Sequence, residues 1–463
     1  MKKSRILALL LCLCMLVGVL AACSKTDTTT PDASGETAQS GDTAKTGDTA
    51  RTGDVVTIRM WGGVPAESGP QAACDAFNEA YKDKGIQVEY ERFVNDDTGN
   101  VKLETNLLGG NEIDVYMSYT MAQLSKRAEG NMALDLTELC ERDGFDLTQY
   151  LGDLAKNYYV DGKPFCIPCK LDQYGMVVNK TMFDEAGIEV PTEWTYDEFL
   201  DVCAKLTHGE GTDKVYGVFW NSQQDMAQYA QFMIQQTLGG DNMYNADGTA
   251  TNFTDDVWQK TISLISTTMN EGYAPTHADS VTEKLSQESM FLGGKAAMTI
   301  GPWMVRNIKD TETYPHDFVT AFAPYPVVSE GQRNYTQGGY GDLLCINPRS
   351  EHLDEAWEFA KWYLTEGGLY LASGGRVPAA NTYNADDVVN AFLSGAENLF
   401  DADSTKAVLI TPHDNYAAPS ITTKNAELTD IINEELEAIY TGQKTVEEGL
   451  ESAKTRGDAA LAG

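Results

Sequence analysis

Basic residues are scarce in this sequence. Its 463 residues include 34 Lys and Arg against 69 Asp and Glu, which gives a formal net charge of -35 at pH 7. Nucleic acids and anionic lipid surfaces are bound through clusters of basic side chains. The composition therefore argues against both as partners. We interpret the acidic excess as a solvated surface, and a cationic ligand stays open as the alternative.

Long hydrophobic runs are also scarce, since the sequence has one, at residues 6–20, directly after a basic start. This run is too short to span a bilayer comfortably, but it suits a secretory signal. Small residues then precede Cys23, which is typical of a bacterial lipoprotein. We predict that residues 1–22 are a lipoprotein signal peptide and that Cys23 receives a lipid. Cleavage of this signal peptide would remove three basic residues and no acidic one. The mature chain would then have 31 basic and 69 acidic residues, a net charge of -38.

Large apolar side chains are absent from residues 24–53, where Gly-Asp-Thr-Ala occurs at 41–44 and again at 47–50. Such a segment cannot bury enough surface to offset the entropy lost on ordering. We therefore predict that residues 23–53 are a lipidated cysteine and a disordered linker, with an end-to-end distance of about 30 Å. The expected location is the extracellular face of the cell membrane, reached through the lipid anchor only.

Cysteines are few in the rest of the chain and do not follow the pattern of a small disulfide-rich scaffold. Cys166 and Cys169 have the spacing of a redox motif, but they follow a turn at 161–164 instead of opening a helix. A local disulfide and free thiols both stay open, and a redox role is disfavoured. Because no second Cys or His pair lies nearby, we predict no metal site.

Catalytic signatures are missing too. The sequence contains no G-x-S-x-G elbow, no H-E-x-x-H helix and no phosphate-binding loop, and Gly293-Gly294-Lys295 departs from such a loop because Ser289 stands at its first glycine. We therefore predict no cofactor and no enzymatic activity. An exported glycan-acting enzyme stays an alternative, because the many carboxylates make suitable pairs plentiful.

Alternating periodicities predict an α/β protein. The roughly 400 residues after the linker exceed what one hydrophobic core usually supports, so we expect two lobes. Strand-like alternation and helical spacing follow one another, which indicates a parallel-rich sheet with helices on both faces. The strands are expected at 56–60, 86–90, 113–117 and 176–178, and the helices at 72–81, 196–206 after a Thr195 cap, 353–364 and 428–439.

Four stretches carry a resemblance to a known family. They are Asn179-Lys180 with Pro191, Trp194 and Phe199; 291–298 ending in Gly301-Pro302-Trp303; Gly338-Gly339 through 356–359 to Gly375-Arg376-Val377-Pro378; and 440–448. In this order and spacing the chain resembles the extracellular solute-binding proteins of carbohydrate ABC importers, the group that includes maltose-binding protein. The departures are the cysteine pair before the crossing strand and Val178, where the family usually has tyrosine.

The resemblance implies a two-lobed periplasmic-binding-protein-like (type II) fold with the ligand cleft at a hinge. It divides the chain into an N-terminal lobe of 54–168 plus 345–385 and a C-terminal lobe of 169–344 plus 386–463. A monomer would close around a mono- or oligosaccharide, and the permease subunits of an ABC transporter would read the closed state. Receptors for a polyamine, a peptide or a glycerol phosphate, and a sensor of bound sugar, stay open as alternatives.

Sugar binding needs aromatic plates for the C–H face and polar side chains for the hydroxyl rim. Family positions suggest Ser118, Tyr119, Asp172 and Trp303, and local residue chemistry suggests the others. The predicted site comprises Trp61, Ser118, Tyr119, Asp172, Tyr174, Trp220, Asn221, Gln224, Trp303, Gly339, Tyr340 and Arg376. Trp61 is equally compatible with a core position, Tyr174 with hinge packing and Arg376 with a structural ion pair.

Overall fold

The computed structural model describes residues 55–463, except 111–112, 223–225, 302–303, 333–338, 414–420 and 422. The chain divides into two compact units, Met1–Thr52 and Gly53–Gly463, and all described residues belong to the second. The predicted signal peptide, Cys23 and the predicted linker lie outside the described residues. None of the helices within the described ranges is long and apolar enough to cross a membrane.

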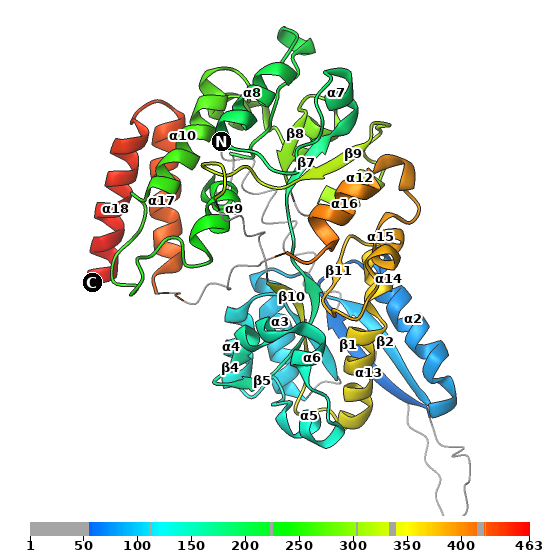
Figure 1. Ribbon diagram of the computed structural model, residues 1–463. Coiled ribbons are helices and arrows are strands. Elements are labelled where there is room, and N and C mark those ends of the chain that lie inside the picture. The colour runs from blue at the N-terminus through cyan, green and yellow to red at the C-terminus, as the bar shows by residue number, and fades with distance from the viewer. Residues whose placement is uncertain are drawn as a thin grey trace, which may run out of the picture. The chain divides into compact units, whose positions relative to one another are not determined.

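The first sheet has six strands in the order β11-β6-β10-β3-β1-β2 (Figure 1). Its strands are β1 (Val56–Gly62), β2 (Ile86–Arg92), β3 (Val115–Ser118), β6 (Ile167–Leu171), β10 (Tyr340–Ile346) and β11 (Val377–Pro378). β1 is parallel to β2 and β3, whereas the other three pairings are antiparallel. The predicted parallel-rich sheet is thus wrong beyond the first three strands, because local strand–helix alternation does not fix the direction of a strand that returns from far along the chain.

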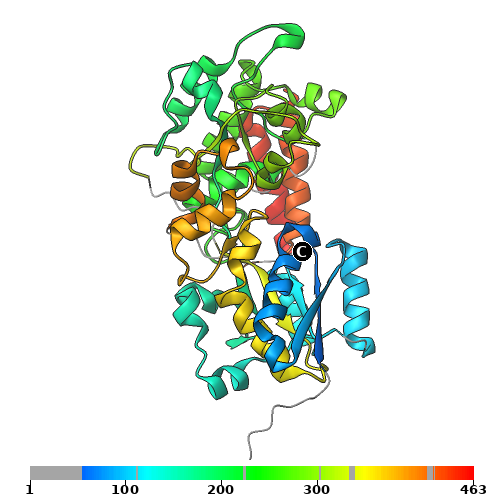
Figure 2. The same ribbon diagram turned by 90° about the vertical axis from the view of Figure 1, so that its right-hand side faces the viewer.

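Helices cover both faces of this sheet, as predicted. Alternate residues of β1 point to opposite faces, so Met60 packs with α2 (Pro70–Tyr81) and α13 (Leu353–Thr365), while Trp61 packs with α3 (Asp97–Gly109). Figure 2 shows the yellow α13 and the light-blue α3 on opposite sides of the blue strands. Each face therefore has its own apolar core.

The second sheet has three antiparallel strands in the order β8-β7-β9, namely β7 (Met176–Asn179), β8 (Met298–Ile300) and β9 (Thr320–Ala323). It shares one large core with helices from three separate parts of the chain. These are α8 (Tyr196–Leu206), α9 (Met226–Leu238), α10 (Asp256–Asn270), α17 (Asn425–Tyr440) and α18 (Val446–Ala462). The two sheets with their separate cores make the protein two-lobed.

Shorter elements complete the described fold. The helices are α4 (Met121–Glu129), α5 (Thr137–Asp143), α6 (Leu147–Leu151), α7 (Lys180–Glu185), α11 (His277–Glu283), α12 (Met304–Lys309), α14 (Gly368–Ala372), α15 (Ala385–Leu393) and α16 (Ala402–Thr405). β4 (Tyr159–Val160) and β5 (Lys163–Pro164) form a small hairpin. The short 3-10 helices are η1 (Ala66–Ser68), η2 (Lys82–Lys84), η3 (Asp153–Tyr158), η4 (Gly211–Asp213) and η6 (Glu397–Leu399), and the short π-helices are η5 (Glu288–Leu292) and η7 (Lys406–Ile410).

The chain crosses from the first sheet to the second at residues 172–175, between β6 and β7. Gln173 is buried in this crossing segment and uses its whole amide. Its Nε2 donates to the carbonyls of Leu409 (3.0 Å) and Thr411 (2.9 Å), and its Oε1 accepts from the His413 backbone N–H (2.9 Å). The crossing is therefore fixed to the chain that follows η7.

Local sequence signals locate several elements accurately. The predicted helix at 196–206 is α8, and Thr195 caps it in a capping box with Glu198, whose side chain accepts from the Thr195 N–H. The six cysteines of the described chain are all free, so the local disulfide at Cys166 and Cys169 does not form. Cys166 belongs to the core shared with α3 and Cys169 to the core shared with α2, on opposite faces of β6.

Glu435 on α17 ties the last two helices together. Its carboxylate accepts from Lys444 Nζ, Ser452 Oγ (2.8 Å) and Arg456 Nη1 (2.8 Å), and its side chain is almost fully buried. Burial alone would raise the pKa of this carboxyl, but the hydrogen bonds from Lys444, Arg456 and Ser452 outweigh it and lower the pKa. A lowered folded-state pKa adds stability above the unfolded pKa of about 4.3, and this is lost as the pH falls through the folded pKa.

We expect Glu435→Gln to lower the free energy of unfolding by about 1–2 kcal/mol at pH 7, because its cationic partners are themselves partly exposed. The deficit should shrink as the pH falls below the unfolded pKa of about 4.3, because the unfolded wild-type chain then binds a proton that the folded chain takes up only at lower pH. Urea unfolding at several pH values measures it. A deficit that is constant from pH 7 to pH 3 would contradict the assigned charge state.

Candidate ligand-binding site

Several of the predicted site residues meet at one edge of the six-stranded sheet. The carboxyl ends of β1 and β3 lie there, and the end of β6 pairs with the starts of β10 and β11, since Leu171 is opposite both Tyr340 and Val377. In open α/β sheets, ligands bind outside the carboxyl ends of the parallel strands. A ligand is therefore expected at this edge. The segments that converge there are those that follow β1, β3 and β6 and those that precede β10 and β11.

An ion pair stands at the centre of this edge. Arg376 Nε donates to Asp342 Oδ2 (2.7 Å), and both side chains are largely buried. Burial alone would lower the pKa of the Arg376 guanidinium, but the neighbouring Asp342 carboxylate outweighs it and the pKa is raised. The structural ion pair weighed for Arg376 is therefore present, and it orients the rest of the guanidinium.

Two tyrosines pack beneath the glycines that follow Trp61. The Gly63 N–H donates to Tyr119 Oη (2.5 Å), and Tyr90 Oη donates to the Val64 carbonyl (2.6 Å). A Cβ on Gly62 would lie 2.7 Å from Tyr90 Oη, so this position requires glycine. Burial raises the pKa of Tyr119 and of Tyr90, which keeps both phenols neutral.

A second polar cluster follows β6 on the crossing segment. Tyr174 Oη donates to Asp172 Oδ1 (2.6 Å), Lys170 Nζ donates to Tyr174 Oη (3.3 Å), and Lys170 also pairs with Asp172. The Asp172 N–H donates to the Gly339 carbonyl (3.0 Å), which joins the crossing segment to the entry of β10. Asp172 and Tyr174 therefore lie together at the hinge, each half-buried.

The entry of β10 is shaped by Tyr158. Its Oη accepts from the Tyr340 N–H, and a Cβ on Gly339, where φ is +117°, would lie 2.5 Å from the same oxygen. Tyr340 Oη donates to the Leu151 carbonyl, and burial raises the pKa of Tyr340 to about 12. The Tyr340 hydroxyl is thus used within the protein.

Three predicted site residues occupy core positions. Ser118 is fully buried and accepts from Arg127 Nη1 (2.8 Å). Trp61 is nearly buried with Lys102 Nζ 5.0 Å from its ring centroid. Trp220 is 2% exposed, and its Nε1 donates to Thr268 Oγ1 (2.9 Å).

The remaining predicted residues belong to the segment after Trp220 and to the strand exit before α12. Asn221 Nδ2 donates to Gln287 Oε1 (3.4 Å) in the core of the second lobe. Gln224 and Trp303 lie outside the described residues. Their contact with a ligand stays a prediction.

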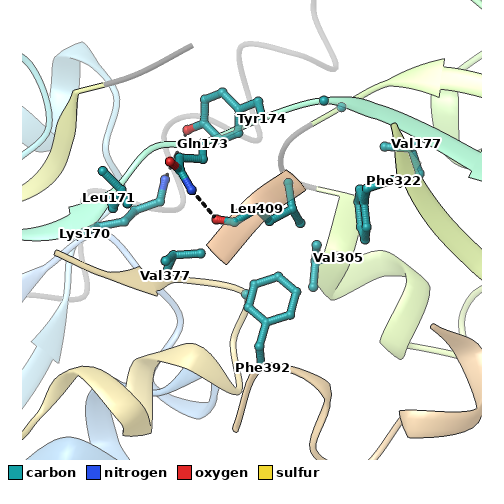
Figure 3. A pocket seen from close by; sticks show the side chains of 13 residues that line it. Lys170, Leu171, Gln173, Tyr174, Val177, Val305, Phe322, Val377, Phe392 and Leu409 are labelled. Atoms are coloured by element: carbon teal, nitrogen blue, oxygen red, sulfur yellow. Dashed lines mark hydrogen bonds between the residues drawn. The ribbon is translucent and has the colours of Figure 1, made fainter. Parts of the chain in front are cut away.

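A cavity of about 240 Å³ opens between the crossing segment, α12 and the loop before β11. It is lined by Lys170, Tyr174, Val305, Arg306, Gly374, Gly375 and Arg376. An apolar pocket adjoins it, and Figure 3 shows Val305, Phe392 and Leu409 on one side of that pocket and Lys170 with Tyr174 on the other. Both lobes thus contribute to one hollow at the hinge.

Sequence reasoning missed Val305 and Arg306. The family-like stretch ends at Trp303, and both residues follow it within the short helix α12 (Met304–Lys309). Their position at the cavity depends on how α12 packs against the loop before β11, which the residue pattern does not show. Within the described part of the chain, no group of three or more His, Cys, Asp or Glu side chains is suited to hold a metal ion.

Comparison with known proteins gives the family. A family model described as bacterial extracellular solute-binding protein matches residues 62–369, which is more than half of the chain. The multiple sugar-binding protein of Streptococcus mutans is 25% identical over 218 residues, which are 46% of this chain and 50% of that protein, so the match spans about half of that relative. The chain belongs to the family of bacterial extracellular solute-binding proteins.

Solved structures with the same fold include two sugar-related proteins. A sugar transporter protein of Rhizobium etli in an open conformation has a TM-score of 0.69 at 22% identity, over 87% of this chain and 99% of that one. The sugar-binding protein MalE of Xanthomonas citri has a TM-score of 0.65 at 19% identity, over 88% and 98%. At these identities the likeness shows the fold, which is the two-lobed type II fold that the sequence predicts.

Proposed function

We propose that this protein is a membrane-anchored extracellular receptor that binds a carbohydrate by hinge closure and delivers it to the permease of an ABC transporter. The observation that carries the proposal is one hollow lined by Tyr174 and Arg376, with Asp172 hydrogen-bonded to Tyr174 and with Tyr340 opposite the end of β6. Rings and charged groups side by side suit a ligand with an apolar face and a rim of hydroxyls. The names of the relatives, which refer to sugars, support the same ligand class.

The way the cavity is built supports hinge closure. Lys170 and Arg376 come from the six-stranded sheet and its edge, whereas Val305 and Arg306 come from α12 beside the three-stranded sheet. A ligand that contacts both groups binds the closed arrangement better than the open one, so it shifts the population toward closure. The two-lobe division of the sequence prediction stays part of this proposal, but its boundaries at 168/169 and 344/345 would cut β6 and β10, so we place the first crossing at residues 172–175 and the second before Tyr340.

The proposed ligand contacts are a subset of the predicted ones. We retain Tyr119, Asp172, Tyr174, Asn221, Gln224, Trp303, Gly339, Tyr340 and Arg376. We assign Ser118, Trp61 and Trp220 to support of the cleft, because their polar atoms or rings are occupied inside the protein. Anchoring through Cys23 is part of the proposal and rests on the signal-like residues before it.

Thermal unfolding of residues 54–463 against a panel of mono- and oligosaccharides, polyamines and peptides tests the proposal. A sugar at 100 times its dissociation constant should stabilise the protein by about 2.7 kcal/mol. Asp172→Ala and Trp303→Ala should each abolish this gain, because each removes a proposed ligand contact. Asp153→Ala, at an exposed aspartate on η3, is the matched control and should keep it.

Stabilisation by a polyamine or a peptide, with none by any sugar, would refute the carbohydrate proposal and leave a receptor for another solute. Product formation from a glycan would instead favour the exported enzyme. An unchanged sugar response in both hinge variants would refute the site.

A further inference from the structure

We propose that the sugar carries a carboxylate, as a uronic acid residue does, and that Lys170, Arg306 and Arg376 hold it at the hinge. This inference rests on the proposed function and narrows its substrate class. The three cations surround the 240 Å³ cavity between the crossing segment and α12. A hollow of this size is below the usual range for a whole ligand site, so it suits the charged end of a larger sugar.

The charge of the cavity is opposite to that of the protein. Among the residues that the structure describes, seven line the cavity; three of these are basic and none is acidic. The whole chain has 69 acidic and 34 basic residues, so the surroundings of an arbitrary cavity would be acidic. A neutral sugar gives no reason for this local reversal, whereas an anionic one does, because it gains from each cation that it approaches.

The three cations differ in how far they are already neutralised. Lys170 pairs with Asp172, and Arg376 donates its Nε to Asp342. Arg306 is exposed and makes no ion pair with the side chains described. Among the described residues, these three cations and the two carboxylates that pair with them sum to one net positive charge, which matches a single carboxylate better than a phosphate dianion.

Arg376 is arranged for this role. Arg376 lines the cavity, and its Nε donates to Asp342, which fixes the plane of the guanidinium and leaves the two terminal nitrogens free of the ion pair. The planar guanidinium fork matches the two oxygens of a carboxylate. The ion pair with Asp342 therefore orients Arg376 without using up its binding capacity.

The loop before β11 and α12 are held close together, which brings Arg306 to the same cavity. Lys309, one turn after Arg306, donates to the carbonyls of Ser373 (2.8 Å) and Phe392. A Cβ on Gly375 would lie 3.1 Å from the Val305 side chain, in a backbone conformation with φ of +82° that favours glycine. The close approach of two chain segments at a glycine thus places two arginines from separate segments on one hollow.

Isothermal titration calorimetry with glucuronate, galacturonate and their disaccharides tests the inference, with glucose, galactose, maltose and glucose 6-phosphate as comparison ligands. We expect a uronate ligand to bind at least about 10-fold tighter than its neutral counterpart. Arg306→Gln should weaken the uronate by about 10- to 100-fold, as expected for the loss of a charge-assisted hydrogen bond, and should weaken a neutral sugar by a clearly smaller factor.

Lys260→Gln is the matched control, since it removes one positive charge from an exposed helix position of the same lobe where Lys260 pairs with Asp256. It should leave uronate affinity within about 2-fold, because an exposed pair is worth little. Circular dichroism checks that both variants fold.

Tighter binding of neutral sugars, or equal uronate affinity in wild type and Arg306→Gln, would overturn the inference and leave the proposed function intact. Preference for glucose 6-phosphate over both uronates would overturn the assignment of a carboxylate. If none of the charged or neutral sugars binds, the proposed function itself fails.

Discussion

Replacing Arg127 by methionine should lower the free energy of unfolding by about 3 kcal/mol, although this residue is charged and lies on a surface helix. Arg127 on α4 is 0% exposed and donates to Ser118 Oγ (2.8 Å), Asn100 Oδ1 (2.6 Å) and Glu104 Oε1 (3.4 Å). Removing one partner of a buried ion pair typically costs about 3–5 kcal/mol. We expect the lower end, because Lys126 still neutralises Glu104.

Lys126→Met is the matched control for Arg127→Met. Lys126 precedes Arg127 on the same helix and pairs with the same carboxylate (2.6 Å), but its side chain is 65% exposed. An exposed pair contributes about 0–1 kcal/mol, so the two variants should differ several-fold in their cost. Urea unfolding measures both, and equal losses would contradict the buried network.

The network around Arg127 bears on the ligand site, because Ser118 is part of it. Ser118 ends β3, and Tyr119 follows directly at the cleft edge. Arg127→Met should therefore also weaken sugar binding through displacement of Tyr119, whereas Lys126→Met should not.

Replacing Gln173 by leucine should lower the free energy of unfolding by about 2–3 kcal/mol. The amide makes three hydrogen bonds to the backbone of residues 409–413, and the side chain is 3% exposed. Leucine fits the volume but leaves two carbonyls and one N–H without their partner, and each buried unsatisfied group costs about 1–3 kcal/mol. We expect the lower part of the summed range because water can reach some of these groups once the segment loosens.

Gln71→Leu makes the same chemical change at an exposed position of α2, where the amide bonds only to Asp75 (2.9 Å). It should change stability by less than about 0.5 kcal/mol. Because Gln173 fixes the crossing segment, its variant should also increase amide hydrogen exchange at residues 409–413. If the amides of residues 409–413 are protected from exchange equally in the Gln173→Leu variant and the wild type, Gln173 does not fix the crossing segment.

The local elements of the fold were predictable because their signals are local. The strand at 56–60, the helix at 72–81 and the capped helix at 196–206 all form close to their expected bounds. The antiparallel entry of β10 was not predictable from alternation, since its partners β3 and β6 are far away in sequence. The direction of such a strand depends on the path of the whole chain.

The candidate site was predictable in its position but not in its chemistry. Asp172, Tyr174, Tyr340 and Arg376 come together because strand ends converge, and strand ends can be read from periodicity. Trp220 and Ser118 could not be distinguished from ligand contacts, since their burial depends on Thr268 and Arg127, which lie elsewhere in the sequence. Arg306 was missed because exposure and a cavity are properties of three-dimensional packing.

The free cysteines have a practical consequence for fluorescence measurements of ligand binding. Of the six thiols in the described chain, five are buried and Cys140 on α5 is half-buried. Burial raises the pKa of the Cys140 thiol to about 11, so few molecules carry the reactive thiolate at neutral pH. A cysteine introduced at an exposed cleft position would therefore react with a fluorescent maleimide far ahead of the native thiols. The protein is suited to become an optical sensor for its own ligand without prior removal of any cysteine from its folded part.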